Sequence, residues 1–290
     1  MDFFLLLISN GLIAGAGYGL IAMGFALVYK ATGVVNFALG ELVMLTAYVS
    51  FSIAERTGFS FLALMAATIP VSMLIGLTLE RIFIRPMLGE PPFALVMTTI
   101  GLAVILRGAV LMIWGPDPAV FNAGLPTGLL HIGPVPFYPA QLTMIAALAC
   151  VTVAAWAFLR FSRIGIAMRA VASNETAALL VGVSVNRIHA FAWMFSSAIA
   201  SVAGVLFAAN FKLAPDLWFQ GLKSFPAVIM GGLDSVIGAS LAGLVIGVVE
   251  NLFQGYIGQG MREISGFIVI IIVLMIRPQG LFGSRDIERV

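Results

Sequence analysis

Charge is the scarcest property of this 290-residue chain. Charged residues make up 10% of it, whereas soluble globular domains carry roughly 25%. Hydrophobic residues make up 61%, and the mean hydropathy is +1.09. The basic residues gather in a few short segments instead of forming a nucleic-acid-binding face. This composition excludes a soluble globular domain and predicts a polytopic membrane protein whose partners include the lipid bilayer and no nucleic acid.

Cysteine and histidine are almost absent as well. The single cysteine, Cys150, excludes a disulfide framework within the chain and supplies too few thiolates for an iron-sulfur cluster. We interpret it as a buried apolar side chain. His131 has no second histidine or cysteine at ligand spacing, so we expect no metal site.

Sequence motifs for catalysis and nucleotide binding are also lacking. The segment 221–224, GLKS, lacks the upstream glycine and the Gly-Lys pair of a phosphate-binding loop. Neither a His-Glu-x-x-His metalloprotease motif nor a Gly-x-Ser-x-Gly elbow occurs. We therefore expect a protein that is not an enzyme, binds no cofactor and does not bind ATP itself.

Long apolar runs fill most of the chain. A membrane-spanning helix needs about 20 mostly apolar residues, and the sequence predicts an all-α bundle with eight or nine crossing segments in a single domain over residues 1–290. Their expected ranges are 3–29, 37–54, 59–79, 93–114, 140–159, 189–210, 213–232, 236–256 and 264–276. The range 213–232 contains two prolines, an aspartate and a lysine, which predicts a broken helix.

Basic residues beside the spans predict the orientation, because they mark the cytoplasmic side. They occur after the third span, in the segment 160–188 and in the C-terminal tail, at Arg277, Arg285 and Arg289. Counting crossings back from these positions places the N-terminus outside and the C-terminus inside. The proline-rich segment 115–139 is then an outer, periplasmic loop, and 30–36 is a tight cytoplasmic connection.

Small residues at four-residue spacing mark one face of two distant helices. Such faces let two membrane helices approach closely. We expect these two faces to pack in the core. Their residues are Gly11, Gly15, Gly19 and Ala239, Gly243, Gly247.

Three charged residues fall within apolar runs. For Glu41 and Glu250 we favour solvated positions near an interface, and a role inside the membrane stays open for both. Arg107 either extends its side chain to the outer interface or pairs with one of these acids. A substrate pathway through Asn36, Glu41, Lys223 and Glu250 is the functional alternative to purely structural roles.

Several stretches together resemble one family over essentially the whole chain. They are GLIAGAGYGLIAMGFALVYKATGVVNFALGELVML near the start, ERIFIRP at 80–86, SRIGIAMRAVASNETAALLVGV at 162–183, KSFPAVIMGGLDSVIGASLAGLVIGVVE at 223–250 and RPQGLFG at 277–283. Their order and spacing resemble the permease subunit of branched-chain amino acid ABC importers, the H-type member of the LivH/LivM permease family. The family's NFAxGE pattern is present at 36–41, with Leu39 where many members carry a polar residue or histidine.

The resemblance implies a subunit of the bacterial inner membrane that works with a second, LivM-like permease, two ATPase subunits and a periplasmic substrate-binding protein. ATP would be bound by those partner subunits. In such importers a cytoplasmic helix-turn-helix loop docks on the ATPase, and 160–188 would be that coupling loop. The implied coupling residues are Gly165, Arg169, Asn174, Glu175, Ala178 and Gly182.

Alternatives remain open at this point. Relatives with similar signatures carry urea, short amides or other amino acids. An autonomous channel or ion-coupled carrier, with Glu41, Arg107 and Glu250 as a charge relay, is a hypothesis from another class. A purely structural scaffold would leave the coupling loop unexplained.

Overall fold

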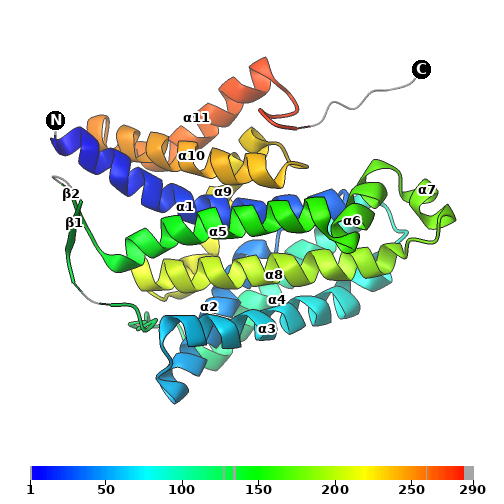
Figure 1. Ribbon diagram of the computed structural model, residues 1–290, viewed down its shortest axis with the longest axis horizontal. Helices are drawn as coiled ribbons and strands as arrows, with labels where there is room; N and C mark the ends of the chain where they lie inside the picture. Colours follow the sequence, from blue (N-terminus) through cyan, green and yellow to red (C-terminus); the bar gives the residue numbers. More distant parts are fainter. Residues whose placement is uncertain (1, 127, 133–134, 259, 284–290) are drawn as a thin grey trace.

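The computed structural model describes residues 2–126, 128–132, 135–258 and 260–283. Within them the chain forms a bundle of helices with one short antiparallel hairpin (Figure 1). The longer helices are α1 (Asp2–Thr32), α2 (Leu39–Thr57), α3 (Phe61–Leu79), α4 (Pro92–Trp114), α5 (Pro139–Phe161), α8 (Val185–Asn210), α10 (Val236–Tyr256) and α11 (Met261–Ile276). The shorter ones are α6 (Arg163–Ser173), α7 (Glu175–Leu180) and α9 (Phe219–Gly231), with the π-helix η1 (Glu80–Ile84) and the 3-10 helices η2 (Arg85–Met87) and η3 (Pro215–Trp218).

The hairpin lies in the segment expected to be a loop, where β1 (Leu130–Ile132) pairs with β2 (Val135–Phe137). It sits near the start of α1, at one end of the bundle, which we call the hairpin end (Figure 1). The helices α6 and α7 project at the opposite end, the α7 end. The side chain of His131 lies outside the described residues.

Six helices are long and apolar enough to cross a membrane: α1, α3 with its extension through η2, α4, α5, α8 and α10. Three further expected spans do not meet that standard. Helix α2 carries Glu41, Glu55 and Arg56 within its 19 residues, while α9 has 13 residues and α11 has 16. The helical membrane class is confirmed, whereas the expected count of eight or nine segments is not.

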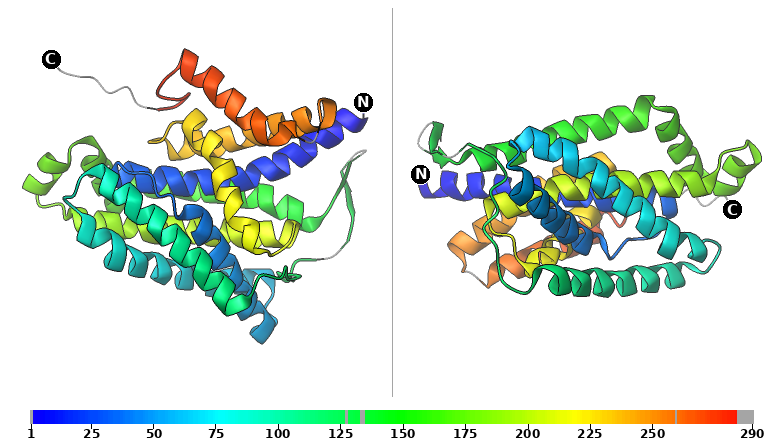
Figure 2. Two further views of the ribbon diagram at one scale, coloured as in Figure 1. Left: turned by 180° about the vertical axis from the view of Figure 1, so that it is seen from behind. Right: turned by 90° about the horizontal axis from the view of Figure 1, so that it is seen from below.

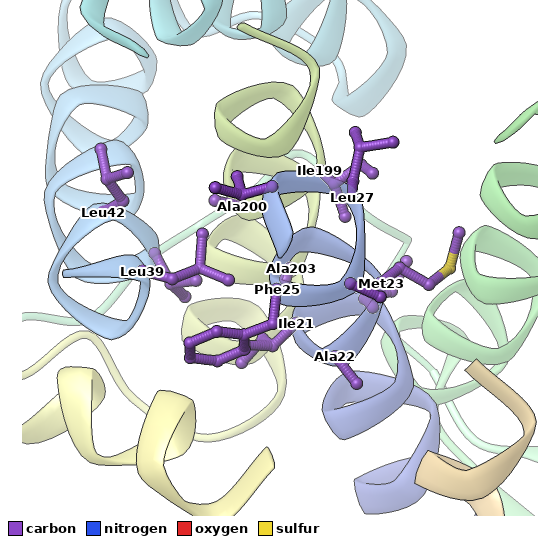
Figure 3. Packing of buried hydrophobic residues seen from close by; sticks show 14 of the residues in the cluster. Ile21, Ala22, Met23, Phe25, Leu27, Leu39, Leu42, Ile199, Ala200 and Ala203 are labelled. Atoms are coloured by element: carbon purple, nitrogen blue, oxygen red, sulfur yellow. The ribbon is translucent and has the colours of Figure 1, made fainter. Parts of the chain in front are cut away.

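Helix α1 lies at the centre of the bundle. Figure 3 shows Ile21 and Leu27 of α1 among side chains of α2 and α8, such as Leu42 and Ala200, whereas Met23 points toward α5. These residues are almost completely buried. The opposite side of α1 packs along α10 (Figure 1).

The two small-residue faces expected from the sequence lie against each other in this α1–α10 contact. A Cβ atom built on Gly15 would lie 2.7 Å from the carbonyl oxygen of Gly243, and one on Gly19 would lie 2.6 Å from that of Ser240. Real Cβ atoms essentially never approach another heavy atom this closely. The two backbones are therefore in direct contact, and a larger residue at these positions would force them apart.

Helix α2 begins inside the bundle. The connection expected over 30–36 does not stay at the end of the bundle, because Asn36 is only 1% exposed and Ala38 is fully buried. Leu39, the first residue of α2, lies against Gly24 in the middle of α1. The chain thus leaves α1 at Thr32 and re-enters the bundle before α2 starts.

Helix α9 also begins inside the bundle, after the irregular stretch 211–214 and η3. A Cβ atom on Gly221 would collide with the backbone of Gly40, so the first turns of α9 and α2 touch. Figure 2 shows α2, in blue, and α9, in yellow, approaching each other within the bundle. The segment expected as a broken helix begins with the irregular residues 213–214 and then changes from the 3-10 helix η3 to α9 at Phe219, and α9 continues through Pro226.

The outer faces of α4 and α5 carry exposed apolar side chains, including Val104, Met112 and Val153. Cys150 belongs to this outer face, so its interpretation as a buried side chain is wrong. A helix with lipid on one side buries only a narrow stripe, and Cys150 falls outside that stripe.

Candidate functional site

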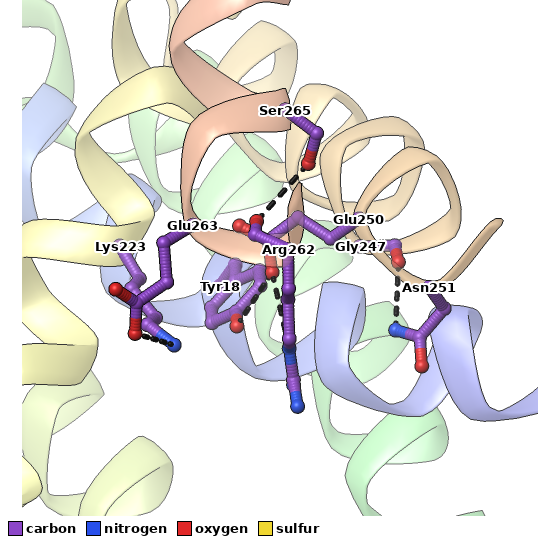
Figure 4. A network of polar contacts seen from close by, with 8 residues as sticks. All are labelled: Tyr18, Lys223, Gly247, Glu250, Asn251, Arg262, Glu263 and Ser265. Carbon is purple, nitrogen blue, oxygen red and sulfur yellow. Dashed lines mark hydrogen bonds and ion pairs between the residues drawn. The ribbon is translucent and has the colours of Figure 1, made fainter. Parts of the chain in front are cut away.

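A polar cluster around Glu250 connects α1, α10 and α11 (Figure 4). The Tyr18 hydroxyl donates a hydrogen bond of 2.9 Å to Glu250 Oε2, and Arg262 Nε lies 3.8 Å from the same oxygen. Glu250 is 2% exposed. The favoured interpretation, a solvated glutamate near the outer interface, is therefore wrong, because α11 and Tyr18 cover it.

A cavity of about 150 Å³ lies beside this cluster. Its charged and polar walls include Asp216, Gln220, Lys223 and Arg262, and Lys223 Nζ also lies 3.7 Å from Glu263. Its apolar and aromatic walls are formed by Ala14, Tyr18, Phe207, Phe211 and Leu217, and Lys212 also contributes.

The walls of this cavity combine charges of both signs with aromatic rings. Because a water molecule occupies about 30 Å³ of liquid, the space suits a small molecule and not a drug-sized ligand. Lys223 and Arg262 offer donors for a carboxylate, and Asp216 offers an acceptor for an ammonium group. Phe207 and Tyr18 provide an apolar surface. The arrangement therefore suits a small zwitterion with an apolar side chain.

A second charged cluster lies where α2, α4 and η3 meet. An Arg107 guanidinium nitrogen is 2.5 Å from Glu41 Oε1, and its central carbon lies 3.6 Å from the centre of the Trp218 ring. Glu41 is 3% exposed, so the favoured interpretation of a solvated residue near an interface is wrong. Of the two alternatives for Arg107, the structure shows the ion pair with Glu41. We call these three residues the Arg107 clamp.

The four residues expected along a substrate pathway do not form one cluster. Lys223 lines the cavity, and Glu250 reaches it through Tyr18. Glu41 belongs to the Arg107 clamp. Asn36 accepts a hydrogen bond from Ala38 N, and among the described residues its side-chain nitrogen has no hydrogen-bond partner.

Sequence reasoning missed most of the cavity. Tyr18, Phe207, Gln220 and Arg262 were not among the expected site residues, yet all four line it. The sequence does contain one usable signal for Tyr18. It is the only tyrosine among the small and apolar residues 11–28, and a buried tyrosine usually needs a partner for its hydroxyl group.

A larger groove of about 920 Å³ opens at the α7 end. Its walls come from the end of α1, from α6 and α7, from the turn between α9 and α10, and from residues 278–279 after α11. Lys30 donates a hydrogen bond of 2.8 Å to the backbone oxygen of Asp234 across it. Three expected coupling residues, Arg169, Asn174 and Glu175, line this groove.

The other three expected coupling residues shape the α6–α7 hairpin. Gly165 packs against the end of α5, where a Cβ atom would lie 2.6 Å from Leu159 Cα. Ala178 is buried on α7, and Gly182 takes a φ of +85° in the turn that follows α7. Only glycine adopts that conformation without strain. Asn174 additionally caps α7 by accepting a hydrogen bond from Ala177 N.

The tip of this hairpin is apolar and exposed. Leu180 is 84% exposed and Val181 is 79% exposed. Exposed apolar residues that project from a membrane bundle beside a polar groove indicate a contact surface for another protein.

The segment after α11 returns to the turn that closes the groove. Leu281 N donates a 2.8 Å hydrogen bond to Met230 O, and Phe282 N donates one of 3.2 Å to Gly231 O. These bonds satisfy carbonyl groups at the end of α9. The groove therefore lies at the C-terminal end of α9, and the cavity and the Arg107 clamp lie at its N-terminal end. Arg285 and Arg289 lie outside the described residues.

Comparisons with known proteins agree on one family. The family model described as branched-chain amino acid transport system / permease component matches residues 7–276. The high-affinity branched-chain amino acid transport permease LivH of Escherichia coli K12 is 31% identical, over 99% of this chain and 98% of its own. BraD of Pseudomonas aeruginosa is 30% identical over 97% and 96%, and the ribose import permease RbsC of Escherichia coli K12 is 26% identical over 80% and 73%. No solved structure matches the chain.

Proposed function

Because the chain belongs to the permease family of branched-chain amino acid transport systems, we propose that it is the membrane-spanning subunit of an ATP-driven importer for branched-chain amino acids. The observation that carries this proposal is the similarity to LivH over 99% of this chain and 98% of LivH. The protein is accordingly a multi-pass protein of the inner membrane.

The proposed partners are a LivM-like second permease, two ATPase subunits and a periplasmic binding protein. The sequence lacks a phosphate-binding loop, so the ATP cycle would have to reach the bundle from another chain. The exposed tip at Leu180 and Val181, beside the groove, supports contact with an ATPase at the α7 end.

We propose nine crossing segments, of which six are the long apolar helices and three are the shorter α2, α9 with η3, and α11. They are α1, α2, α3, α4, α5, α8, η3 with α9, α10 and α11. The α7 end gathers many basic residues, namely Lys30, Arg81, Arg85, Arg160, Arg163, Arg169, Arg187 and Arg277. By the positive-inside rule this end is cytoplasmic. The chain then starts outside, residues 115–139 are periplasmic, and the C-terminus is inside.

The cavity beside Tyr18 is the proposed substrate position. Its cations and Asp216 suit the two charged groups of an amino acid, and Phe207 and Phe211 suit an apolar side chain. Urea and short amides lack the two charged groups, so such a cavity favours amino acids over them.

Transport by alternating access requires that ATP binding in the partner changes the relative free energies of two states of the bundle. Helix α9 offers the physical connection, because its end borders the groove at Ile229 and its start borders the cavity at Gln220. A displacement of the α6–α7 hairpin in the groove would thus reach the substrate position through one rigid helix.

The coupling proposal is tested by Leu180→Glu. The charge should prevent burial of the hairpin tip against the ATPase, so we expect loss of ATPase subunits on co-purification and loss of ATP-driven uptake, with unchanged membrane levels. The matched control is Val120→Glu, since Val120 is equally apolar and 94% exposed but lies near the hairpin end. Normal co-purification of the Leu180→Glu variant would refute the assignment.

The transport proposal is tested with the complete complex in proteoliposomes. We expect ATP-dependent uptake of labelled leucine in the presence of the binding protein, and no uptake of urea. Uptake driven by an ion gradient without the ATPase subunits would instead identify an ion-coupled carrier.

A further inference from the structure

Arg107 connects three elements that the sequence places far apart. It lies on α4, forms an ion pair with Glu41 in the first turn of α2, and covers the ring of Trp218 at the end of η3. Its guanidinium is planar and always charged, so it can hydrogen-bond at its edge and stack with its face at the same time. One side chain therefore fixes Glu41 and Trp218 relative to each other.

The backbone around the clamp leaves little freedom for movement. A Cβ atom on Gly40, the residue before Glu41, would lie 3.3 Å from Gly221 Cα and would collide with the carbonyl oxygen of Trp218. The first turn of α2 thus lies directly on the η3–α9 junction. Gly40 therefore contacts Trp218 at its backbone, and Arg107 contacts it at its ring.

The residues next to Trp218 in sequence line the cavity. Asp216 and Leu217 precede it, and Gln220 and Lys223 follow it within one and a half turns. Trp218 itself is not among the residues that line the cavity. Anything that shifts Trp218 must shift these four side chains, because they share one continuous helical segment.

Stability alone is a weak explanation for the ion pair. Glu41 is buried among apolar side chains, and such a pair is often no more stabilising than apolar residues of similar size. Charged residues within membrane helices are costly and usually serve a function. The stacking on Trp218 indicates which segment Arg107 acts on.

We propose that Arg107 is a positioning residue for substrate binding, which acts through Trp218 to hold the cavity-lining start of α9 in place. Glu41 orients the guanidinium for this task. The inference rests on the proposed function, because it assumes that the cavity beside Tyr18 holds the substrate.

The test compares two arginines that each pair with a buried glutamate. Arg107→Gln removes the clamp, whereas Arg85→Gln unpairs Glu80, which is fully buried and lies 3.0 Å from Arg85 at the end of α3. Both changes leave a buried acid without its cation, so their general effects on folding are matched. We expect KM for leucine uptake by the full complex to rise roughly fivefold in Arg107→Gln, the size of a lost cation–π contact from a partly exposed arginine. Arg85→Gln should leave KM unchanged.

Arg107→Lys provides the conservative rescue. Lysine keeps the charge for Glu41 but loses the flat surface for Trp218, so we expect KM between those of the wild type and Arg107→Gln. A fall in maximal rate or membrane level with unchanged KM, in Arg107→Gln and Arg85→Gln alike, would show a merely structural role and overturn the proposal. An unchanged KM and unchanged rate in Arg107→Gln would overturn it as well.

A second measurement does not depend on the substrate. In a Cys150→Ser background, which removes the chain's one cysteine, Gln220→Cys reports the position of the start of α9 through its rate of labelling by a water-soluble maleimide. Arg107→Gln should change that rate severalfold, and Arg85→Gln should not. Altered labelling without leucine transport by the wild type would support the positioning role while refuting the proposed function, and unaltered labelling would refute the positioning role itself.

Discussion

Helices α1 and α5 are nearly equal in hydropathy and opposite in burial. Their most apolar stretches have mean hydropathies of 1.8 and 2.2, yet 94% of the residues in that stretch of α1 are buried and 11% of those in α5. Lipid tails are as apolar as a protein core, so hydropathy does not distinguish a central helix from a peripheral one. The information must come from the size of the side chains.

The spacing of glycine residues, and not their number alone, distinguishes the central helix α1 from the peripheral helix α5. Helix α5 contains no glycine, and α1 contains several, three of which face α10. Helix α4 contains glycines but does not use them for close packing. A Cβ atom added to Gly101 or Gly108 would have no other atom within 4 Å. Those two are seven residues apart, and only the four-residue spacing in α1 is matched by a second small-residue face, on α10. Paired small-residue faces, and not glycine content, identify the centre of the bundle.

The largest effect should follow from Gly15→Leu. A side chain at this position meets the backbone of Gly243 and Leu244 at 3 Å or less, and backbone atoms cannot turn aside as a flexible side chain can. We expect destabilisation by about 3 kcal/mol or more, beyond ordinary overpacking, and loss of the protein from the membrane. Steady-state levels and thermal stability in detergent measure this. Gly108→Leu on α4 is the control, and equal loss in both variants would contradict the importance of the α1–α10 contact.

A smaller effect should follow from Tyr18→Phe. It removes the hydroxyl that donates to Glu250 and leaves that buried acid with Arg262 at 3.8 Å. An unsatisfied buried acceptor costs about 1–3 kcal/mol, so we expect lower thermal stability together with weaker leucine uptake. The corresponding change on α5 is Thr152→Val, which removes only a weak hydrogen bond to the Met23 sulfur. If the Thr152 variant loses as much stability as the Tyr18 variant, the hydrogen bond from Tyr18 on α1 to Glu250 is not specially important for stability.

The sequence was sufficient wherever the evidence was local or periodic. Most helix positions followed from runs of apolar residues, and the two small-residue faces followed from their spacing. The sequence did not reveal how deep a residue lies within the bundle. Glu41 and Glu250 were placed near interfaces because they lie close to the ends of apolar runs, and hydropathy cannot reveal that the chain before α2 re-enters the bundle or that α11 covers Glu250.

The cavity was hidden for a related reason. Its residues come from α1, α8, the stretch 211–212, η3, α9 and α11, and none of these segments contributes more than two of them. Their convergence depends on long-range packing, which leaves no pattern along the sequence. The groove was easier to anticipate, because its Arg169, Asn174 and Glu175 are close together in one polar segment.

The smallest effect should follow from Ala154→Leu on the outer face of α5. Ala154 is exposed, whereas Ala16 on α1 is fully buried. The same substitution therefore adds the same volume to a surface position and to a core position. We expect Ala154→Leu to change stability by no more than about 0.5 kcal/mol, and Ala16→Leu to cost about 1–3 kcal/mol by overpacking. Thermal unfolding of the purified subunit measures both changes. Loss of complex assembly by the Ala154 variant, with its own stability intact, would show that this face of α5 meets another subunit instead of lipid.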